Sequence, residues 1–183
     1  EILVRHRGSE ILSYALAGTA PKDGPNAWTE EQLLTNTKNI IEHNIVRDRI
    51  VNTMRQITPH VTVGETGIME LSHLYHLRTI ITAKDSTKSL VEWAKLLHPT
   101  PALGGEPREK ALALLQEYES HERGMYAAPF GFMKDMGDGI VVVAIRSALI
   151  MDNVLYAYAG CGVVADSDAD EEYAETNNKM RTI

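Results

Sequence analysis

The first part of the chain alternates short apolar runs with turn residues. Residues 1–7 and 10–16 are rich in aliphatic side chains, and Gly8-Ser9 between them is a turn signal. This pattern predicts a β-hairpin, and the small residues 17–20 are expected to end its second strand. Two prolines and a glycine in residues 21–28 then indicate a loop.

A long helical pattern follows this loop. Thr29 and Gln32 have the three-residue spacing of a capping box, so they predict the start of a helix. An apolar stripe continues to about Ile57, and Pro59 ends the helix. Three further helices are expected at 86–97, 108–119 and 169–181.

The remaining segments have the composition of strands and loops. Extended structure is expected at 61–63, 68–82, 124–134, 140–150 and 153–164. The proline-rich segment 98–107 is expected to be a stiff loop. Strands and helices do not alternate as they would in a doubly wound βαβ fold. The sequence therefore predicts an α+β fold in which helices cover one side of an antiparallel sheet.

The composition limits the classes of protein that remain. With 183 residues, 44% of them hydrophobic and 23% charged, the chain can form one globular core. The net charge of −7 argues against nucleic-acid binding, and no apolar run reaches the roughly 18 residues of a membrane span. The single cysteine, Cys161, favours a reducing compartment, so a cytoplasmic protein is expected. Nothing in the sequence indicates an oligomeric state.

Residues 144–179 contain groups suited to binding an anion. Arg146 is suited to bind a carboxylate, because its guanidinium can donate two parallel hydrogen bonds to the two carboxylate oxygens. Gly160 and Gly162 lack a Cβ, so the backbone there can approach a ligand closely. This stretch therefore predicts an anion-binding site.

Acidic residues suited to a cation accompany this stretch. Glu172, Glu175 and Lys179 fall on one face of the last predicted helix, and Glu42 could join them from the long helix. Carboxylates without paired cysteines favour a hard ion such as Mg²⁺ over structural zinc. Glu42 also lies four residues after Lys38, and the simplest interpretation of that pair is a solvated ion pair. The residues alone suggest Mg²⁺ plus a small polyanion.

Short motifs along nearly the whole chain resemble those of the chorismate-utilising enzymes. This family includes isochorismate synthase, salicylate synthase and the first components of anthranilate and aminodeoxychorismate synthase. The motifs are Leu16-Ala-Gly-Thr19, Lys38 with Glu42-His43, Leu74-Tyr-His-Leu77, His98-Pro-Thr-Pro-Ala102, Arg123-Gly124 with Tyr126, Ala144-Ile-Arg-Ser-Ala148, Gly160-Cys-Gly162, and Glu172 with Glu175-Thr176 and Lys179. The resemblance implies that residues 1–183 are the C-terminal portion of one chorismate-binding catalytic domain of antiparallel sheet and helices.

The resemblance also implies which residues bind metal and substrate. Glu42 and Glu175 match the two ligands of Mg²⁺, and Glu172 matches an acid behind them, in the second shell. The positions that match substrate-binding residues are Ala102, Tyr126, Arg146, Gly160, Gly162 and Lys179. Among these, Arg146 and Tyr126 match residues that hold the enolpyruvyl carboxylate of chorismate, and Lys179 matches a lysine near the ring carboxylate.

Four more positions match residues close to the chemistry. Glu1 matches the general acid that protonates the leaving C4 hydroxyl, so a raised pKa is expected for it. Gly18 and Thr19 match the wall beside the incoming nucleophile, and His76 matches a histidine near the ring. The lysine that serves the family as general base has no match in this chain. The 183 residues alone are therefore expected to be inactive.

Ala102 separates the members of the family. Members that eliminate pyruvate usually carry threonine at this position, whereas isochorismate synthases carry alanine, so the resemblance favours an isochorismate synthase acting in menaquinone or siderophore biosynthesis. Two alternatives stay open. One is a lyase such as salicylate or anthranilate synthase. The other is a non-catalytic protein that still binds chorismate or metal, because Asn39 and Asn36 stand where the family commonly has an acid and a serine.

Overall fold

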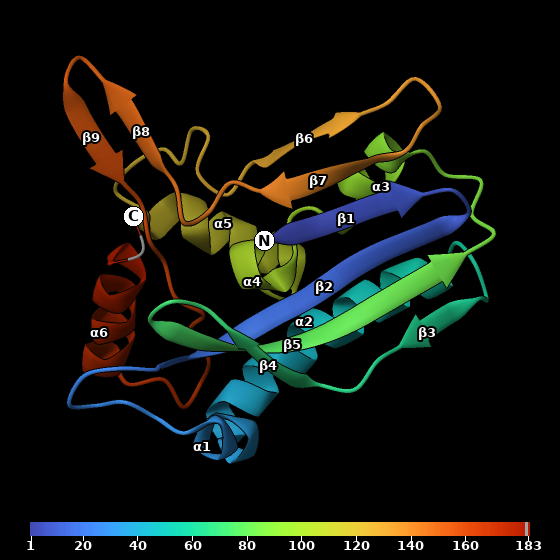
Figure 1. Cartoon of the computed structure of the whole chain (residues 1–183). Coiled ribbons are helices and arrows are strands. Elements are labelled where there is room, and N and C mark those ends of the chain that lie inside the picture. Colours follow the sequence, from blue (N-terminus) through green and yellow to red (C-terminus); the bar gives the residue numbers. More distant parts are fainter. Residues whose placement is uncertain (182) are drawn as a thin grey trace.

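A long β-hairpin forms the centre of the fold (Figure 1). In the computed structural model, which describes residues 1–181 and 183, β1 (Ile2–Arg7) pairs with β2 (Glu10–Pro21). The expectation that residues 17–20 end the second strand is wrong, because β2 runs on and pairs with β5 (Leu74–Lys84) as far as Pro21. The register shifts between Ala17 and Thr19, where Gly18 has a φ of 78°.

Seven strands form one antiparallel sheet in the order β3-β5-β2-β1-β7-β6, with β4 also paired to β5. The bounds of the other strands are β3 (Val61–Val63), β4 (Gly67–Glu70), β6 (Pro129–Met133) and β7 (Gly139–Val143). The predicted run 68–82 is therefore two strands, because the chain turns back after Glu70. Within 124–134, only the part from Pro129 to Met133 is a strand.

The predicted strand 140–150 is also interrupted. After β7 the chain leaves the sheet, and Arg146 takes a φ of 53° before β8 (Ala148–Met151) begins. β8 pairs with β9 (Val154–Ala157) in a separate two-stranded sheet, so the strand predicted at 153–164 is shorter than expected. Residues 158–168 then cross back toward the main sheet without strand structure.

The long predicted helix is two helices. Thr29 and Gln32 form the expected capping box at the start of α1 (Glu30–Thr35). The chain then breaks at Asn36, whose side chain accepts a hydrogen bond from the Asn39 backbone amide and so caps α2 (Thr37–Arg55). A polar cap inside the periodic pattern thus overrides the continuity that the apolar stripe suggested.

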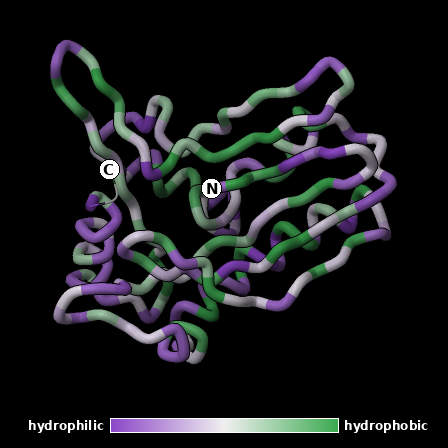
Figure 2. The backbone as a smooth tube through the Cα atoms, viewed as in Figure 1, coloured by the Kyte–Doolittle hydropathy of each residue, from purple (hydrophilic) through white to green (hydrophobic). Residues whose placement is uncertain are grey.

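Three of the four remaining helices in the described part of the chain lie within segments predicted as helices, although the first of them begins at Leu90 and not at Ser86. The four are α3 (Leu90–Leu97), α4 (Pro101–Gly104), α5 (Arg108–Tyr118) and α6 (Ala169–Met180). α4 lies inside the segment expected to be a loop, where Pro101 occupies the first helical turn. Figure 2 shows that apolar residues follow the central strands, whereas α6 is mostly hydrophilic.

The core forms where α2 and α3 pack on the sheet (Figure 1). Leu3, Ile11 and Ile81 of the strands, Met54 of α2 and Trp93 of α3 are all buried in one cluster. These contacts fix α2 against β2, which places the helix beside the bulge at Gly18. In the part of the chain that is described, no helix is long and apolar enough to cross a bilayer.

Candidate functional site

A cavity of about 890 Å³ lies between the main sheet, α2 and the segment 158–165. Most of the residues singled out in the sequence line it: Glu1, Thr19, Glu42, His76, Ala102, Tyr126, Arg146, Gly160, Gly162 and Lys179. Gly18, Glu172 and Glu175 do not line it, although each lies next to a residue that does. The fold therefore brings the predicted site residues together from both ends of the chain.

The sheet and its bulge position the first group of side chains. Thr19 and His76 are directly paired across β2 and β5, just after the register shift, so their side chains point to the same face. Gly18 has no room for a side chain, since a Cβ there would lie 3.1 Å from the Asn39 carbonyl oxygen. The backbone of β2 can thus approach α2, which carries Glu42.

Two carboxylates from different helices lie close together in the site. Burial and the charge of Glu175 on α6 raise the pKa of Glu42 on α2 to about 7. A Cβ added at Gly162 would overlap the Glu42 carboxylate, so any other residue there would force that carboxylate to move. Glu175 is paired with Lys179 at 2.5 Å, and Lys179 Nζ also donates to the Gly160 carbonyl at 2.9 Å. This region holds a pair of acids and one ammonium in a small volume.

Glu172 joins α6 to α2 behind this pair. Its Oε1 lies 2.5 Å from Lys38 Nζ and accepts a hydrogen bond from Ser167 Oγ at 2.7 Å. The simple interpretation of Lys38 and Glu42 as a solvated pair is therefore wrong, because the Lys38 ammonium pairs with Glu172 on another helix. Glu172 Oε2 is buried and has no hydrogen-bond partner among the described residues.

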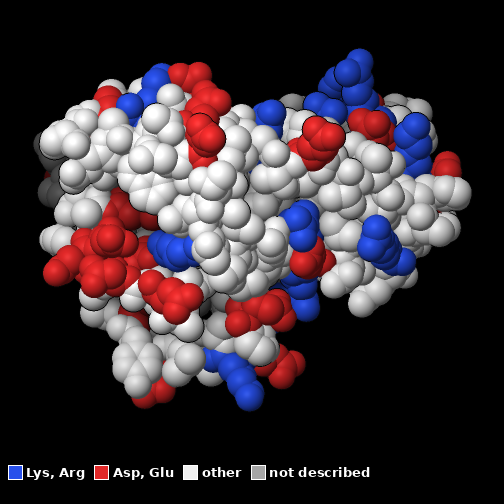
Figure 3. Space-filling model, turned by 90° about the horizontal axis from the view of Figure 1, so that it is seen from below, with Lys and Arg blue, Asp and Glu red and all other residues white. Residues whose placement is uncertain are grey.

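The donor set fits a hard divalent cation. Among residues 1–181 and 183, no three His, Cys, Asp or Glu residues cluster as a complete metal site. Mg²⁺, however, commonly uses only one or two protein carboxylates and completes its octahedron with water and substrate oxygens. Glu42 and Glu175 supply such a pair, and a cation between them would relieve their repulsion. Figure 3 shows further acidic side chains gathered on the side of the molecule where α6 lies.

A second part of the cavity suits an anion. Burial lowers the pKa of Arg146, and its Nε is buried without a partner among the described residues. The Tyr126 hydroxyl lies 3.1 Å from the position that a Cβ would occupy at Gly160, so the two are in contact range. Tyr126 stacks on Tyr158, with ring centroids 5.4 Å apart. A carboxylate bound here could accept a hydrogen bond from the Arg146 Nε–H and lie close to the Tyr126 hydroxyl, whose ring is stacked on Tyr158.

Two ionisable groups near Arg146 favour their neutral forms. Burial raises the pKa of Glu1 to about 7, although the charges of Arg146 and Lys179 oppose the shift. Burial and the positive charges of Arg146 and Lys179 lower the pKa of His76 to about 3. Glu1 can therefore carry a proton near neutral pH, whereas His76 is an uncharged imidazole.

Some residues near the site carried no clear signal in the sequence. Asn39 is buried and its Oδ1 accepts a hydrogen bond from the Thr19 backbone amide at 3.1 Å. In the sequence it is marked only by its position three residues before Glu42, which places both on one helix face, and by the acid that the family commonly has there. Tyr158 follows β9 and becomes relevant only through its stack on Tyr126.

The other histidines and the cysteine have structural surroundings. His43 is buried between the Ala17 carbonyl at 3.2 Å and the Thr79 hydroxyl at 2.7 Å. His98 Nε2 lies 2.8 Å from the Ala127 carbonyl. Burial and the charges of Glu172 and Glu175 raise the pKa of Cys161 to about 11. These contacts assign packing and hydrogen bonding to the residues that the sequence analysis left out of the chemistry.

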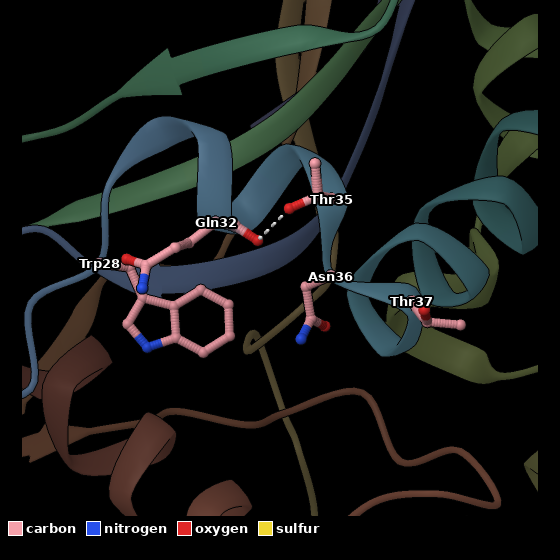
Figure 4. A pocket seen from close by; sticks show the side chains of 5 residues that line it. All are labelled: Trp28, Gln32, Thr35, Asn36 and Thr37. Atoms are coloured by element: carbon pink, nitrogen blue, oxygen red, sulfur yellow. Dashed lines mark hydrogen bonds between the residues drawn. The ribbon is translucent and has the colours of Figure 1, made fainter.

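A separate hollow of about 390 Å³ lies at the junction of α1 and α2 (Figure 4). It is lined by Trp28, Gln32, Thr35, Asn36 and Thr37, none of which is ionisable. The chemically equipped cavity is therefore the one that contains Arg146 and Glu42.

Comparison with known proteins agrees with this placement. The model of the family described as "Chorismate binding enzyme" matches residues 1–183. The chain is 37% identical over 188 residues to the salicylate biosynthesis isochorismate synthase of Pseudomonas aeruginosa, and 35% identical over 187 residues to anthranilate synthase component 1 of Arthrobacter globiformis. The crystal structure of DhbC from Bacillus anthracis superposes with a TM-score of 0.94 at 33% identity.

These relatives are longer than the chain. The alignments cover all of this chain but 40% of the Pseudomonas protein, and 98% of this chain but 35% of the Arthrobacter protein. The superposition on DhbC covers the whole chain and 50% of that structure. The 183 residues thus span at most half the length of these relatives, and within that span the fold is the same.

Proposed function

Because the chain belongs to the chorismate-binding enzyme family, we propose that the complete protein is an isochorismate synthase. The observation that carries this proposal is the cavity lined by Arg146, Lys179 and Glu42, with Glu175 paired to Lys179. Chorismate is a dicarboxylate on a small ring, so its binding calls for two cationic contacts and a divalent cation. The cavity offers groups of each kind.

The proposed contacts follow from the geometry of the two parts of the cavity. Arg146 and the Tyr126 hydroxyl bind the enolpyruvyl carboxylate, helped by the backbone at Gly160 and Gly162. Lys179, held between Glu175 and the Gly160 carbonyl, lies toward the ring carboxylate. The proposal thus assigns a separate cationic side chain to each carboxylate of the substrate.

Mg²⁺ is the proposed cofactor, held by Glu42 and Glu175. When bound, it supplies charge neutralisation for a substrate carboxylate. Glu172 stays bound to Lys38 and Ser167, and its free Oε2 can accept a hydrogen bond from water in the site. Its proposed role is therefore to keep Lys38 and Ser167 in place beside the two carboxylates that bind the metal.

The proposed reaction moves a hydroxyl group across the ring. A water oxygen forms a bond to C2 and gives one proton to a base in the part of the complete protein outside residues 1–183. The diene electrons shift, and the C4 hydroxyl leaves as water after it takes a proton from Glu1. The raised pKa of Glu1 supports this role, because the acid form is then present near neutral pH. Thr19 lines the wall where the attacking water would sit, and Gly18 is its neighbour in β2.

Ala102 favours the isomerase over a lyase. It lines the cavity, and its methyl group offers no hydroxyl that could take part in pyruvate elimination. The name of the Pseudomonas relative agrees with this choice. The similarity to an anthranilate synthase component keeps the lyase as the competing outcome of the test.

Product analysis tests the proposal. The complete protein is incubated with chorismate and Mg²⁺, and the products are separated by chromatography while pyruvate is measured in a coupled assay. Isochorismate without pyruvate is expected, and Glu175→Gln should abolish it. Pyruvate release would instead indicate a lyase. Calorimetric binding of chorismate with Mg²⁺ but without turnover would indicate a non-catalytic binding protein.

A further inference from the structure

A continuous hydrogen-bonded row links three residues on the cavity wall. Arg146 Nη2 lies 2.9 Å from His76 Nε2, and His76 Nδ1 lies 3.0 Å from Thr19 Oγ1. The three residues come from the segment between β7 and β8, from β5 and from β2. All three line the same cavity.

The chemistry of arginine fixes the tautomer of His76. A guanidinium has N–H donors and no acceptor, so His76 Nε2 must be the acceptor in the contact with Arg146. The ring proton of the neutral imidazole therefore lies on Nδ1, which donates to Thr19 Oγ1. Burial and the nearby cations keep the ring uncharged, because they lower its pKa to about 3.

The tautomer in turn fixes the role of the Thr19 hydroxyl. One lone pair of Thr19 Oγ1 is taken by His76, so the hydroxyl hydrogen must point elsewhere. The described residues offer it no other hydrogen-bond partner, and Thr19 lines the cavity. Its backbone is also held, because the amide donates to Asn39 Oδ1. The hydroxyl hydrogen can therefore point into the cavity.

We propose that His76 is a positioning residue, locked by Arg146 as the Nδ1–H tautomer, which makes the Thr19 hydroxyl a donor to an oxygen of the ligand. This inference rests on the proposed function, since it names the group that meets the substrate at one wall of the site. The oxygen belongs either to a ring substituent or to the attacking water. In both cases Thr19 touches the reacting molecules, while His76 acts through Thr19.

Isosteric variants of His76 separate this role from acid or base catalysis. His76→Asn keeps an N–H at the position of Nδ1, whereas His76→Gln moves the amide toward the position of Nε2. In the complete protein, His76→Asn should keep kcat/KM within about tenfold, and His76→Gln should lose about 10²-fold, as Thr19→Val should. Thr19→Ser retains the hydroxyl and serves as the control. The proposal would be wrong if His76→Gln kept most of kcat/KM while His76→Asn lost it.

A double-mutant cycle gives a second, independent readout. If His76 acts only through Thr19, then His76→Gln should cost little in a Thr19→Val background. Losses that multiply would show that His76 acts on the substrate itself, and the proposal would be wrong. A loss confined to kcat would identify the attacking water as the acceptor, whereas a raised KM with weaker binding of an unreactive analogue would identify a ring substituent.

Nitrogen NMR tests the tautomer without any substrate. With histidines labelled and His76 assigned through His76→Gln, the ligand-free protein should show a proton on Nδ1 and an unprotonated Nε2. A proton on Nε2 would overturn the proposal, whatever reaction the protein catalyses. If chorismate is not turned over but the Nδ1–H tautomer is found, the proposed reaction fails while the lock between Arg146, His76 and Thr19 stands.

Discussion

At the scale of single residues, burial decides which groups can exchange protons. Glu1 has a pKa of about 7 because it is buried, despite the opposing charges of Arg146 and Lys179. We therefore expect the rate of the complete protein to fall about tenfold per pH unit above pH 7, as Glu1 loses its proton. Glu1→Gln should lower kcat by about 10²- to 10⁴-fold. Initial rates between pH 5 and pH 9 check both expectations.

Glu10→Gln is the matched control for this experiment. Glu10 also lies on the hairpin, but it is partly exposed and pairs with Arg5 at 3.7 Å, away from the cavity. Its replacement should leave the rate and its pH profile unchanged. A rate that stays flat up to pH 9 would show that Glu1 is not the acid.

Cys161 illustrates the opposite effect of burial on reactivity. Burial and the charges of Glu172 and Glu175 raise the pKa of its thiol to about 11, and the nucleophile is the thiolate. Alkylation by iodoacetamide at pH 8 should therefore be about 100-fold slower in the folded chain than in urea. The rate should still rise tenfold between pH 9 and pH 10. Equal rates in the folded and unfolded chains would contradict this expectation.

At the scale of elements, the pair between Lys38 and Glu172 joins α2 to α6. Their side chains are only 21% and 7% exposed, so removal of one partner leaves a buried charge. Lys38→Met should lower the free energy of unfolding by about 3 kcal/mol. The double variant Lys38→Met with Glu172→Gln should recover part of that loss. Urea unfolding followed by circular dichroism measures both changes.

The pair of Lys88 and Glu92 provides the comparison. It is an ion pair at 3.2 Å with side chains 37% and 50% exposed, so Lys88→Met should cost less than about 1 kcal/mol. Equal losses for Lys38→Met and Lys88→Met would show that the contact between α2 and α6 contributes no more than a surface pair.

The elements differ in how well the sequence predicts them. Thr29 and Gln32 reveal the start of α1 because a capping box uses residues close in sequence. Asn36 was missed as a helix break, since the apolar stripe on either side is continuous and its cap depends on Asn39. The end of β2 was missed because pairing with β5, and not the small side chains of residues 17–20, decides where that strand stops.

The break at Arg146 could not be predicted for a similar reason. The apolar residues on both sides of it suit a strand, whereas Arg146 takes a φ of 53° and interrupts the strand. Its guanidinium meets His76, which lies far away in the sequence. The residue types alone therefore predict an anion-binding site. The hydrogen bonds that link Arg146, His76 and Thr19 can be recognised only in the folded structure.

At the scale of the whole molecule, the site is a junction between distant parts of one chain. Glu42 lies on α2, which is fixed by the sheet, and Glu175 lies on α6, which contacts β2. Spacing along the sequence could not place these two acids together. The motif resemblance supplied that link, and the arrangement of α2 and α6 provides its physical basis (Figure 1).

This junction predicts that Mg²⁺ stabilises the fold. An ion held by Glu42 and Glu175 binds the folded chain, because the unfolded chain does not keep the two carboxylates close. At one hundred times its Kd, the ion should add about 2.7 kcal/mol to the free energy of unfolding and raise Tm by roughly 5–10 °C. Thermal unfolding with increasing MgCl₂, compared with NaCl at equal ionic strength, measures the shift.

Two substitutions on α6 make this last prediction specific. Glu175→Gln removes one proposed ligand and should abolish the shift, whereas Glu171→Gln, an exposed residue on the same helix, should leave it intact. General screening of the acidic surface would act on both variants alike, because each loses one negative charge. An equal shift in both would therefore place the ion elsewhere, and no shift in the unaltered chain would show that the two carboxylates do not hold Mg²⁺.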